Sequence, residues 1–315
     1  EKNSSAETKA RHKENELWLA VYLPKLALEA VTQNKSLKSY VLVEEVKGKQ
    51  FIHTASDLAE DSGVVAGMPL NAAYLLCPDL EIEDINEFAQ QQRLQQLASW
   101  ALQYSPRVSL EPPCSFILEI RGSIQYFGSL EIIREKIADA LKNKWQHGYH
   151  LAISPTPAAS LLLARAPGQI TVNNIPDLRS ALGDLSINLL PLDEKRRRQL
   201  GKIGVRILRD LWRLPRAELS RRLGVDLITY LDQVLGNLSS PLINYQAPPR
   251  FEIIYDIGCE VDNYQLLLPV TDKLLNNLSD FLRKNDVYTS SFIFYFQHQQ
   301  HIPTSIKIDL RQKLR

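Results

Sequence analysis

The stretch LWLAVYLPKLALEA (17–30) gives the clearest indication of architecture, because it places a buried strand directly before a helix. Residues 17–23 form an almost unbroken apolar run, which is typical of a strand covered on both faces. Pro24 has no backbone N–H and ends that strand. From Leu26 to Val31 the apolar residues recur with helical spacing. We therefore predict a strand over 17–23 followed by a helix over 26–31.

Strands and helices continue to alternate up to residue 166. Lys47-Gly48-Lys49 separates two apolar, β-branched runs and is typical of a hairpin turn. Elements in this mixed order predict an α+β fold, a sheet layered with helices, rather than a long parallel array. The further strands are expected at 40–46, 51–55, 108–110, 115–120 and 149–154, and the helices at 57–62, 70–76, 86–104, 130–145 and 158–164.

The rest of the chain changes character twice. Residues 176–242 have an almost entirely helical pattern punctuated by glycines, and a proline-containing linker follows. Beyond the linker we expect a helix over 271–284 and strands over 291–297 and 304–310. We place the leucines of 264–268 in a first core strand of this last segment. The pattern stops abruptly, so a truncated domain is expected there.

Composition excludes several classes of protein. Of the 315 residues, 44% are hydrophobic and 23% charged, which is incompatible with disorder along the whole length. No apolar run approaches the roughly 18 residues that cross a bilayer. Residues 1–16 lack the apolar core of a signal peptide and are expected to form a disordered tail. Three scattered cysteines favour neither a disulfide framework nor a metal cluster, so the expected compartment is a reducing cytoplasm.

The net charge of +1 is an average of unlike regions. Residues 195–222 contain eleven basic side chains and only two acids, whereas residues 79–87 contain five acids and no base. A basic stretch in an otherwise acidic chain indicates a localised contact with a polyanion. The alternative is a solvated helical surface. The acidic run is either a docking surface for a basic partner or an ordinary solvated strand edge and helix start.

LGKIGVRILRDLWRLP (200–215) has the pattern of a helix-hairpin-helix. We expect one helix to end at Leu200, a glycine-containing turn to follow, and a second helix to begin by Arg206. Gly204 would let backbone N–H groups approach a phosphate, and arginines spaced along one helical face would add cations to the same contact. A purely structural helical hairpin is the alternative. The candidate DNA-binding residues are Lys202, Gly204, Arg206, Arg209 and Arg213.

Three further stretches resemble the Y-family, or translesion, DNA polymerases. ASDLAEDSGVVAGMPLNAAYLLCPDL (55–80) is similar to the small fingers domain, SPRVSLEPPCSFILEIRGS (105–123) to a palm strand, and HLAISPTPAASLLLARA (150–166) to a phosphate-binding helix. The resemblance implies an α+β fold with a ferredoxin-like palm, small fingers, a helix-hairpin-helix thumb and a truncated little finger. The implied boundaries are 17–31 and 80–166 for the palm, 32–79 for the fingers, 167–243 for the thumb and 250–315 for the little finger.

The resemblance also implies that the polymerase site is degenerate. Nucleotidyl transfer needs two Mg²⁺ held by carboxylates. The metal-binding acids of the family would fall on Tyr22, Cys114 and Ser115. The arginine that meets the incoming triphosphate would fall on Glu60, and the phosphate-binding lysine on Pro157. Of the family's acids only a structural one remains, as Glu119, so no metal or other cofactor is expected.

An intact scaffold with an emptied site is similar to the non-catalytic Y-family homologues of bacterial damage-induced mutagenesis. The resemblance therefore implies a DNA-binding hub in translesion synthesis and the SOS response, in the cytoplasm and associated with the nucleoid. Its implied partners are DNA, contacted through the backbone, a sliding clamp, a RecA-like accessory protein and an error-prone replicative-type polymerase. The alternatives are a divergent active polymerase using Glu119 or unrecognised acids, and a protein-interaction scaffold that does not bind DNA.

Two other patterns have the spacing of metal sites. His298 and His301 form an HxxH pattern, for which an exposed strand end or turn is the favoured interpretation. Asp57, Glu60 and Asp61 lie close together in the sequence, but a charged helix face beside a capping residue explains them better. Neither pattern leads us to predict a bound metal.

Overall fold

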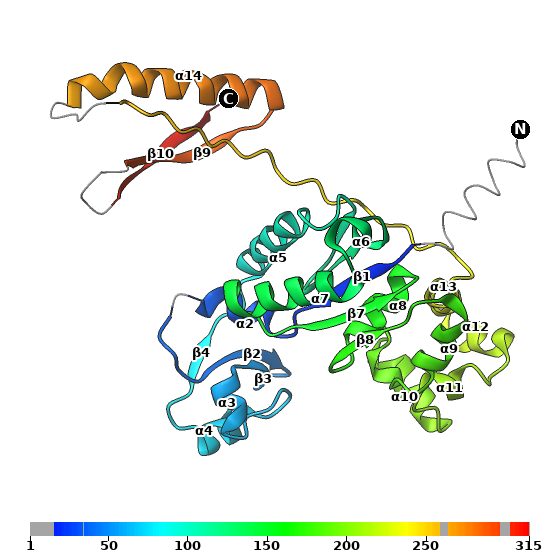
Figure 1. The fold of residues 1–315 in the computed structure, drawn as a ribbon. Helices are drawn as coiled ribbons and strands as arrows, with labels where there is room; N and C mark the ends of the chain where they lie inside the picture. The colour runs from blue at the N-terminus through cyan, green and yellow to red at the C-terminus, as the bar shows by residue number, and fades with distance from the viewer. Residues whose placement is uncertain (1–15, 34, 259–263, 297–302, 315) are drawn as a thin grey trace, which may run out of the picture. The chain divides into compact units, whose positions relative to one another are not determined.

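The structure is a computed structural model that describes residues 16–33, 35–258, 264–296 and 303–314. The chain divides into two compact units, residues 1–247 and 248–315. The first contains a five-stranded sheet, a three-stranded sheet and a cluster of helices, and the second contains a two-stranded sheet and one long helix (Figure 1). The HxxH pattern at 298–301 lies outside the described residues.

The five-stranded sheet is built around the apolar run at the start of the chain. Its strand order is β5-β6-β1-β7-β8, with β1 antiparallel to both of its neighbours and β8 parallel to β7. The four longer strands confirm the sequence prediction, whereas β8 was not predicted. The strands are β1 (Trp18–Tyr22), β5 (Val108–Glu111), β6 (Ser115–Glu119), β7 (His150–Ser154) and β8 (Gln169–Thr171).

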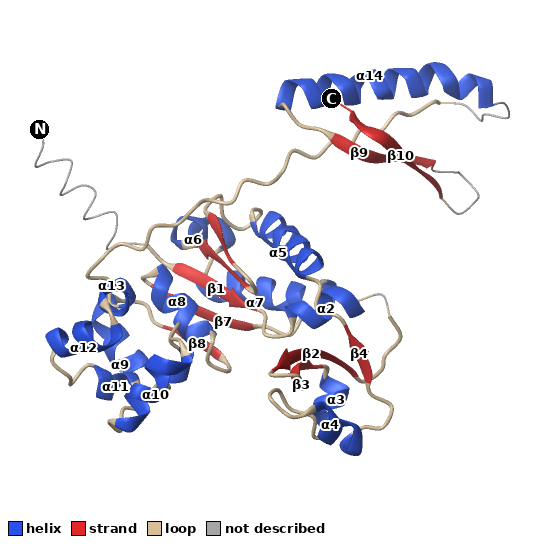
Figure 2. Ribbon diagram, turned by 180° about the vertical axis from the view of Figure 1, so that it is seen from behind, coloured by secondary structure: helices blue, strands red, loops and turns tan. Residues whose placement is uncertain are grey.

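Both faces of this sheet are covered, which explains why β1 is apolar without a break. Leu19 and Val21 pack in the core formed with α5 and α7, whereas Trp18 and Ala20 pack in the core formed with α8. Successive side chains of a strand point to opposite faces, so one strand serves two cores. The helices around the sheet are α2 (Leu26–Thr32), α5 (Glu87–Ala101), α6 (Arg121–Phe127), α7 (Leu130–Asp139), which continues as a π-helical turn over Ala140–Lys144, and α8 (Pro157–Ala164) (Figure 2).

The three-stranded sheet contains the predicted hairpin. Lys47 and Gly48 both have positive φ, 53° and 75°, as a two-residue hairpin turn requires. β2 pairs antiparallel with β3 and parallel with a short strand, β4, that was not predicted. Two short helices pack on this sheet around Ile52, Ala59 and Ala73. The elements are β2 (Tyr40–Val46), β3 (Lys49–Ala55), β4 (Glu81–Glu83), α3 (Asp57–Asp61) and α4 (Leu70–Leu76).

Five helices follow β8 and form what we refer to as the α9–α13 cluster (Figure 1). Leu178, Leu208 and Leu211 are fully buried in its core. That core is continuous with the α8 face of the five-stranded sheet and includes Trp18 and Ala20. The helices are α9 (Ile175–Gly183), α10 (Glu194–Lys202), α11 (Leu208–Leu211), α12 (Arg216–Leu223) and α13 (Val225–Val234), with a 3-10 turn over Ile187–Leu189.

The helical hairpin differs from the prediction in its second helix. α11 begins at Leu208 rather than by Arg206, and it is only four residues long. Ile207 has an extended backbone, with φ −126° and ψ 161°, and it forms an isolated antiparallel bridge with Ser186. This bridge keeps residue 207 out of the helix. Arg206 therefore precedes the helix and Arg213 follows it, so the three arginines do not share one helical face as predicted.

The second unit contains the predicted helix and both predicted strands. Its elements are α14 (Leu268–Asn285), β9 (Thr289–Phe296) and β10 (Thr304–Leu314), and β10 pairs antiparallel with β9. The strand expected over 264–268 is wrong, because Tyr264–Leu267 form a 3-10 turn and Leu268 begins α14. Pro269 is in the first turn of α14, where its missing N–H has no role and its fixed φ favours the helix.

Residue 16 also differs from the prediction, which placed it in a disordered tail. The carboxylate of Glu16 accepts hydrogen bonds from the Arg107 guanidinium at 2.8 Å and from the Trp18 indole N–H at 3.1 Å. Residues 1–15 lie outside the described ranges. Across the described ranges, no helix is both long enough and apolar enough to cross a membrane.

Candidate functional site

The three predicted catalytic positions lie together at one end of the five-stranded sheet. Tyr22, the last residue of β1, is paired in register with Ser115, the first residue of β6. The N–H of Leu23 donates to the carbonyl of Cys114 at 2.8 Å. The structure thus brings Tyr22, Cys114 and Ser115 to one place, and none of them has a carboxylate. Among the described residues, no group of three or more His, Cys, Asp or Glu side chains could hold a metal ion.

Two side chains at this end of the sheet, Tyr22 and Cys114, are held neutral. Burial raises the pKa of Tyr22, Cys114 adds to the rise, and Arg165 opposes it. Burial also raises the pKa of the Cys114 thiol, against the hydrogen bond with Ser115 and the charge of Arg165. His150 is opposite Tyr22 on β7, with ring centroids 5.8 Å apart. Mg²⁺ prefers anionic oxygen ligands, so these donors do not fit a pair of Mg²⁺ ions.

One carboxylate near the site was missed by the sequence analysis. Glu111 ends β5 and is paired in register with Ser115 across the β5–β6 hairpin. Burial raises its pKa, and the charge of Arg165 opposes the rise. Burial also raises the pKa of Tyr230 on α13 to about 12, with Arg165 lowering it and Glu111 raising it. The signal was available, because Glu111 comes directly before the Pro112-Pro113 pair of the palm-like stretch.

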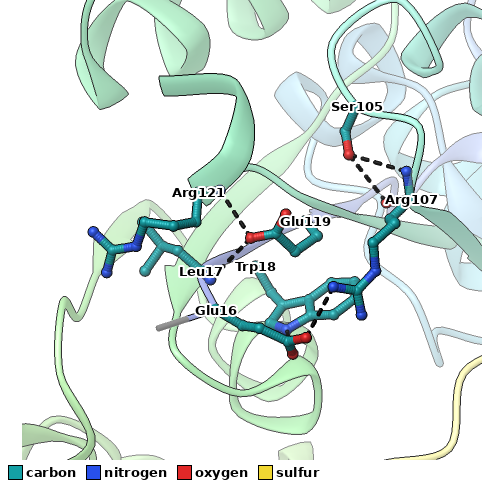
Figure 3. Close-up of polar contacts among 7 residues, drawn as sticks. All are labelled: Glu16, Leu17, Trp18, Ser105, Arg107, Glu119 and Arg121. Carbon is teal, nitrogen blue, oxygen red and sulfur yellow. Dashed lines mark hydrogen bonds and ion pairs between the residues drawn. The ribbon is translucent and has the colours of Figure 1, made fainter. Parts of the chain in front are cut away.

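Glu119, the acid retained from the family pattern, lies at the opposite end of β6 from Ser115. It is paired in register with Trp18, the first residue of β1. Its Oε1 accepts from the N–H of Leu17 at 3.3 Å and from the N–H of Arg121 at 2.9 Å (Figure 3). Glu119 therefore ties the start of β1 to the start of α6. It is separated by the length of the strand from the positions of the metal-binding acids.

Glu60, the predicted triphosphate contact of the fingers, is paired with a cation of the chain itself. Lys25 Nζ contacts Glu60 Oε2 and Asp57 Oδ1, both at 2.6 Å. Burial disfavours the charged form of Lys25, but the hydrogen bonds to Asp57 and Glu60 outweigh it and raise its pKa. The two carboxylates of α3 thus hold the ammonium group of the residue that precedes α2. An acid in place of the expected arginine would repel a triphosphate.

The predicted phosphate-binding position at the start of α8 packs against the inside of the protein. Pro157 is the first residue of α8, and Thr156 caps the helix by accepting from the N–H of Ala159 at 3.2 Å. The hydroxyl of Thr156 also donates to the carbonyl of Val234 in α13 at 2.9 Å. Thr156 is buried, so this position joins the sheet to the α9–α13 cluster and offers no cation to a phosphate.

The predicted DNA-binding residues separate into two groups. Lys202, Gly204 and Arg206 are exposed at the hairpin turn, and within the described residues neither cation has an ion-pair partner. Gly204 has φ +77°, and a Cβ there would meet no atom within 4 Å. Its N–H, however, donates to the carbonyl of Gly201 at 3.1 Å, so this amide is not free for a phosphate as the sequence suggested. The turn therefore offers side-chain cations in an open position.

Arg209 and Arg213, the second group, have carboxylate partners. Arg209 contacts Asp184 at 2.9 Å, and Arg213 contacts Asp210 at 3.6 Å. Several other arginines of the cluster are also paired, so its formal charge is partly compensated. These further pairs are Arg196 with Asp193 and Asp226, Arg197 and Arg198 with Glu194, Arg216 with Asp232, and Arg222 with Glu218.

Comparison with solved structures identifies the fold. The chain is similar to DinB from Sulfolobus solfataricus, with a TM-score of 0.57 and 15% identity over 94% of this chain and 88% of that one. It is equally similar to Dbh DNA polymerase in a post-insertion binary complex, with a TM-score of 0.58 and 15% identity over 95% of this chain and 89% of that one. Residues 27–165 match the impB/mucB/samB family model. The chain therefore has the fold of the Y-family DNA polymerases.

Among proteins of known sequence, the chain resembles Protein ImuB from two strains of Caulobacter vibrioides. The identity is 27% over 191 residues, which covers 60% of this chain and 42% of the relative. The chain thus spans less than half the length of these relatives.

Proposed function

We propose that the protein is a non-catalytic, DNA-binding Y-family polymerase homologue that acts as a hub in bacterial damage-induced translesion synthesis. The observation that carries this proposal is the set of side chains where β1 ends and β6 begins. Tyr22, Cys114 and Ser115 come together where metal-binding acids are expected, and the raised pKa values of Tyr22 and Cys114 keep both groups neutral. Three neutral side chains at these positions cannot balance the charge of two divalent ions.

In this proposal the α9–α13 cluster is the thumb, and DNA is bound through its phosphates. Exposed Lys202 and Arg206 at the hairpin turn are the first contacts, because no carboxylate among the described residues neutralises them. Cations that contact phosphates release counterions, so affinity falls with salt and carries no sequence preference. Two such contacts correspond to a slope of about −2 in log K against log salt.

The resemblance to ImuB supports a role in assembly rather than synthesis. The proposed partners are a sliding clamp, a RecA-like accessory protein and an error-prone replicative-type polymerase, which would supply the synthesis that this site lacks. The proposed location is the cytoplasm, with the nucleoid. We assign no segment of the chain to any of these partners.

Primer extension on a primed template tests the non-catalytic reading. We expect no templated incorporation with Mg²⁺ or with Mn²⁺, measured alongside salt-dependent binding of the same duplex by fluorescence anisotropy. An active Y-family polymerase in the same buffer controls for the substrate. Templated extension by the purified chain would contradict the proposal, and duplex binding that does not respond to salt would contradict the thumb assignment.

Glu111 is the one observation that favours a divergent active polymerase. It is the carboxylate brought next to Ser115, whereas Glu119 lies at the other end of the strand. If the chain extends primers, Glu111→Gln should abolish the activity. Glu119→Gln should leave the activity per amount of folded protein unchanged. If the chain does not extend primers, neither substitution changes that result, and the hub proposal stands.

A further inference from the structure

The exposed arginines of the α9–α13 cluster are paired in two structurally different ways. Arg196 with Asp226 and Arg216 with Asp232 join separate helices, α10 to α13 and α12 to α13. Hydrogen bonds from these arginines lower the pKa values of Asp226 and Asp232. These two pairs therefore link helices of the cluster to one another.

The pairs of Arg209 and Arg213 differ in place, because they lie beside the hairpin turn, and Arg209 with Asp184 links α11 to the residue that follows α9. Arg209 and Asp184 have side-chain exposures of 50% and 73%, and Arg213 and Asp210 have 73% and 34%. Asp210 and Arg213 are in the same short segment, and Asp184 directly follows the end of α9. Exposed pairs of this kind contribute little to stability, and another anion can replace the carboxylate.

Arg209 is also held in place by the backbone beneath it. A Cβ added at Gly183 would lie 3.2 Å from Arg209 Nε and 3.4 Å from one terminal nitrogen, so the guanidinium lies across this glycine. The small residue allows the close approach, and Asp184 contacts the side chain from the next position. Arg209 therefore packs against Gly183. Its partner is a carboxylate that a phosphate could replace.

We propose that Asp184 and Asp210 set the affinity of this protein for a nucleic-acid backbone by occupying Arg209 and Arg213. The inference rests on the proposed DNA-binding function and adds its affinity-setting residues. Binding exchanges a carboxylate for a phosphate at each arginine, and the displaced aspartate then remains near the bound polyanion. Both effects oppose binding, so the wild-type protein binds a backbone more weakly than its arginine content suggests. The uncompensated contacts are Lys202 and Arg206.

The test measures salt-dependent anisotropy of a labelled DNA duplex with the full chain. Asp184→Asn and Asp210→Asn are each expected to tighten binding by about three- to tenfold at low salt, from release of one cation and loss of one nearby repulsion. The slope of log K against log salt should become steeper by about one per substitution. Asp177→Asn is the matched control. It removes the same charge from the exposed first turn of α9, where the Asp177 carboxylate accepts from the side-chain amide of the capping residue Asn174 and contacts no arginine in the described structure.

A mutant cycle separates release of the arginine from a general change of charge. In an Arg209→Ala background, Asp184→Asn should change the affinity by less than about twofold, because no cation is left to release. An equal gain in both backgrounds, or an equal gain from Asp177→Asn, would overturn the inference. Thermal melts of every variant ensure that affinities are compared between folded proteins.

The outcomes also distinguish this inference from the function on which it rests. If Lys202 and Arg206 support salt-dependent binding but Asp184→Asn and Asp210→Asn leave affinity and slope unchanged, the inference is wrong and the proposed function stands. If the wild-type chain and both asparagine variants bind no duplex even at low salt, the DNA-binding function itself fails.

Discussion

Two regions of the molecule differ in the charge that their side chains carry. One is the place where β1 ends and β6 begins, and the other is the hairpin turn of the α9–α13 cluster. At the first, Tyr22, Cys114 and Ser115 are half-buried or buried and neutral. At the second, Lys202 and Arg206 are exposed and charged. The difference teaches that apolar packing on both faces of the sheet holds this fold with neutral side chains at the end of β1 and the start of β6.

The largest expected effect comes from reversing charge at the turn. Lys202→Glu together with Arg206→Glu should weaken duplex binding by on the order of 100-fold at low salt, through two lost phosphate contacts and two new repulsions. The melting temperature should not change, because both side chains are exposed and unpaired within the described structure. Lys136→Glu with Lys142→Glu makes the same change of charge near the end of α7. An equal loss in this control would show that overall charge, and not the turn, governs binding.

The opposite outcome is expected where β1 ends and β6 begins. Tyr22→Asp with Cys114→Asp places two like charges in a half-buried position and should lower the free energy of unfolding by about 2–4 kcal/mol. Duplex affinity of the remaining folded protein should be unchanged. Millimolar Mg²⁺ should recover part of the stability in this variant and none in the wild type, as measured by urea denaturation with and without the ion. A wild-type chain stabilised by Mg²⁺ would break the comparison, because its site would then already bind a cation.

The smallest effect concerns Glu111 and depends on pH. Its pKa is raised in the folded state, so the folded state binds the proton more tightly than the unfolded state does. The contribution of Glu111 to stability is therefore greatest below the ordinary carboxyl pKa and declines as the pH rises above it. Glu111→Gln should remove this decline and raise the melting temperature slightly at neutral pH. Melts at pH 4, 5, 6 and 7 measure the difference, and parallel curves for the two proteins would contradict the assignment.

The sequence predicted the central strands and the hairpin because their signals are local. An unbroken apolar run at β1 and a Lys-Gly turn at residues 47–48 need no distant partner to be recognised. β8 was missed because three residues carry no periodicity, and it forms only by pairing with β7. The start of α11 was misplaced because the bridge between Ser186 and Ile207 overrides the helical spacing of the arginines.

The sequence singled out three candidate positions but not the residues around them. Tyr22, Cys114 and Ser115 lie together, as strand order required, but Glu111 becomes their neighbour only through the β5–β6 register. The sequence also showed the arginines without their partners. Asp184 is distant from Arg209 in the chain and reaches it through the packing of α11 on α9. Pairings of this kind are properties of the tertiary structure.

The shared core of the α9–α13 cluster and the five-stranded sheet has a consequence for dissecting the molecule. Trp18 and Ala20 belong to the same apolar cluster as Leu208 and Leu211. A fragment cut out at the chain boundaries of the helices would leave one side of that cluster in water and would lose the hydrogen bond between Thr156 and Val234. We expect the excised helices to be poorly folded. In the intact chain we expect the α9–α13 cluster to melt together with the sheet in one cooperative transition.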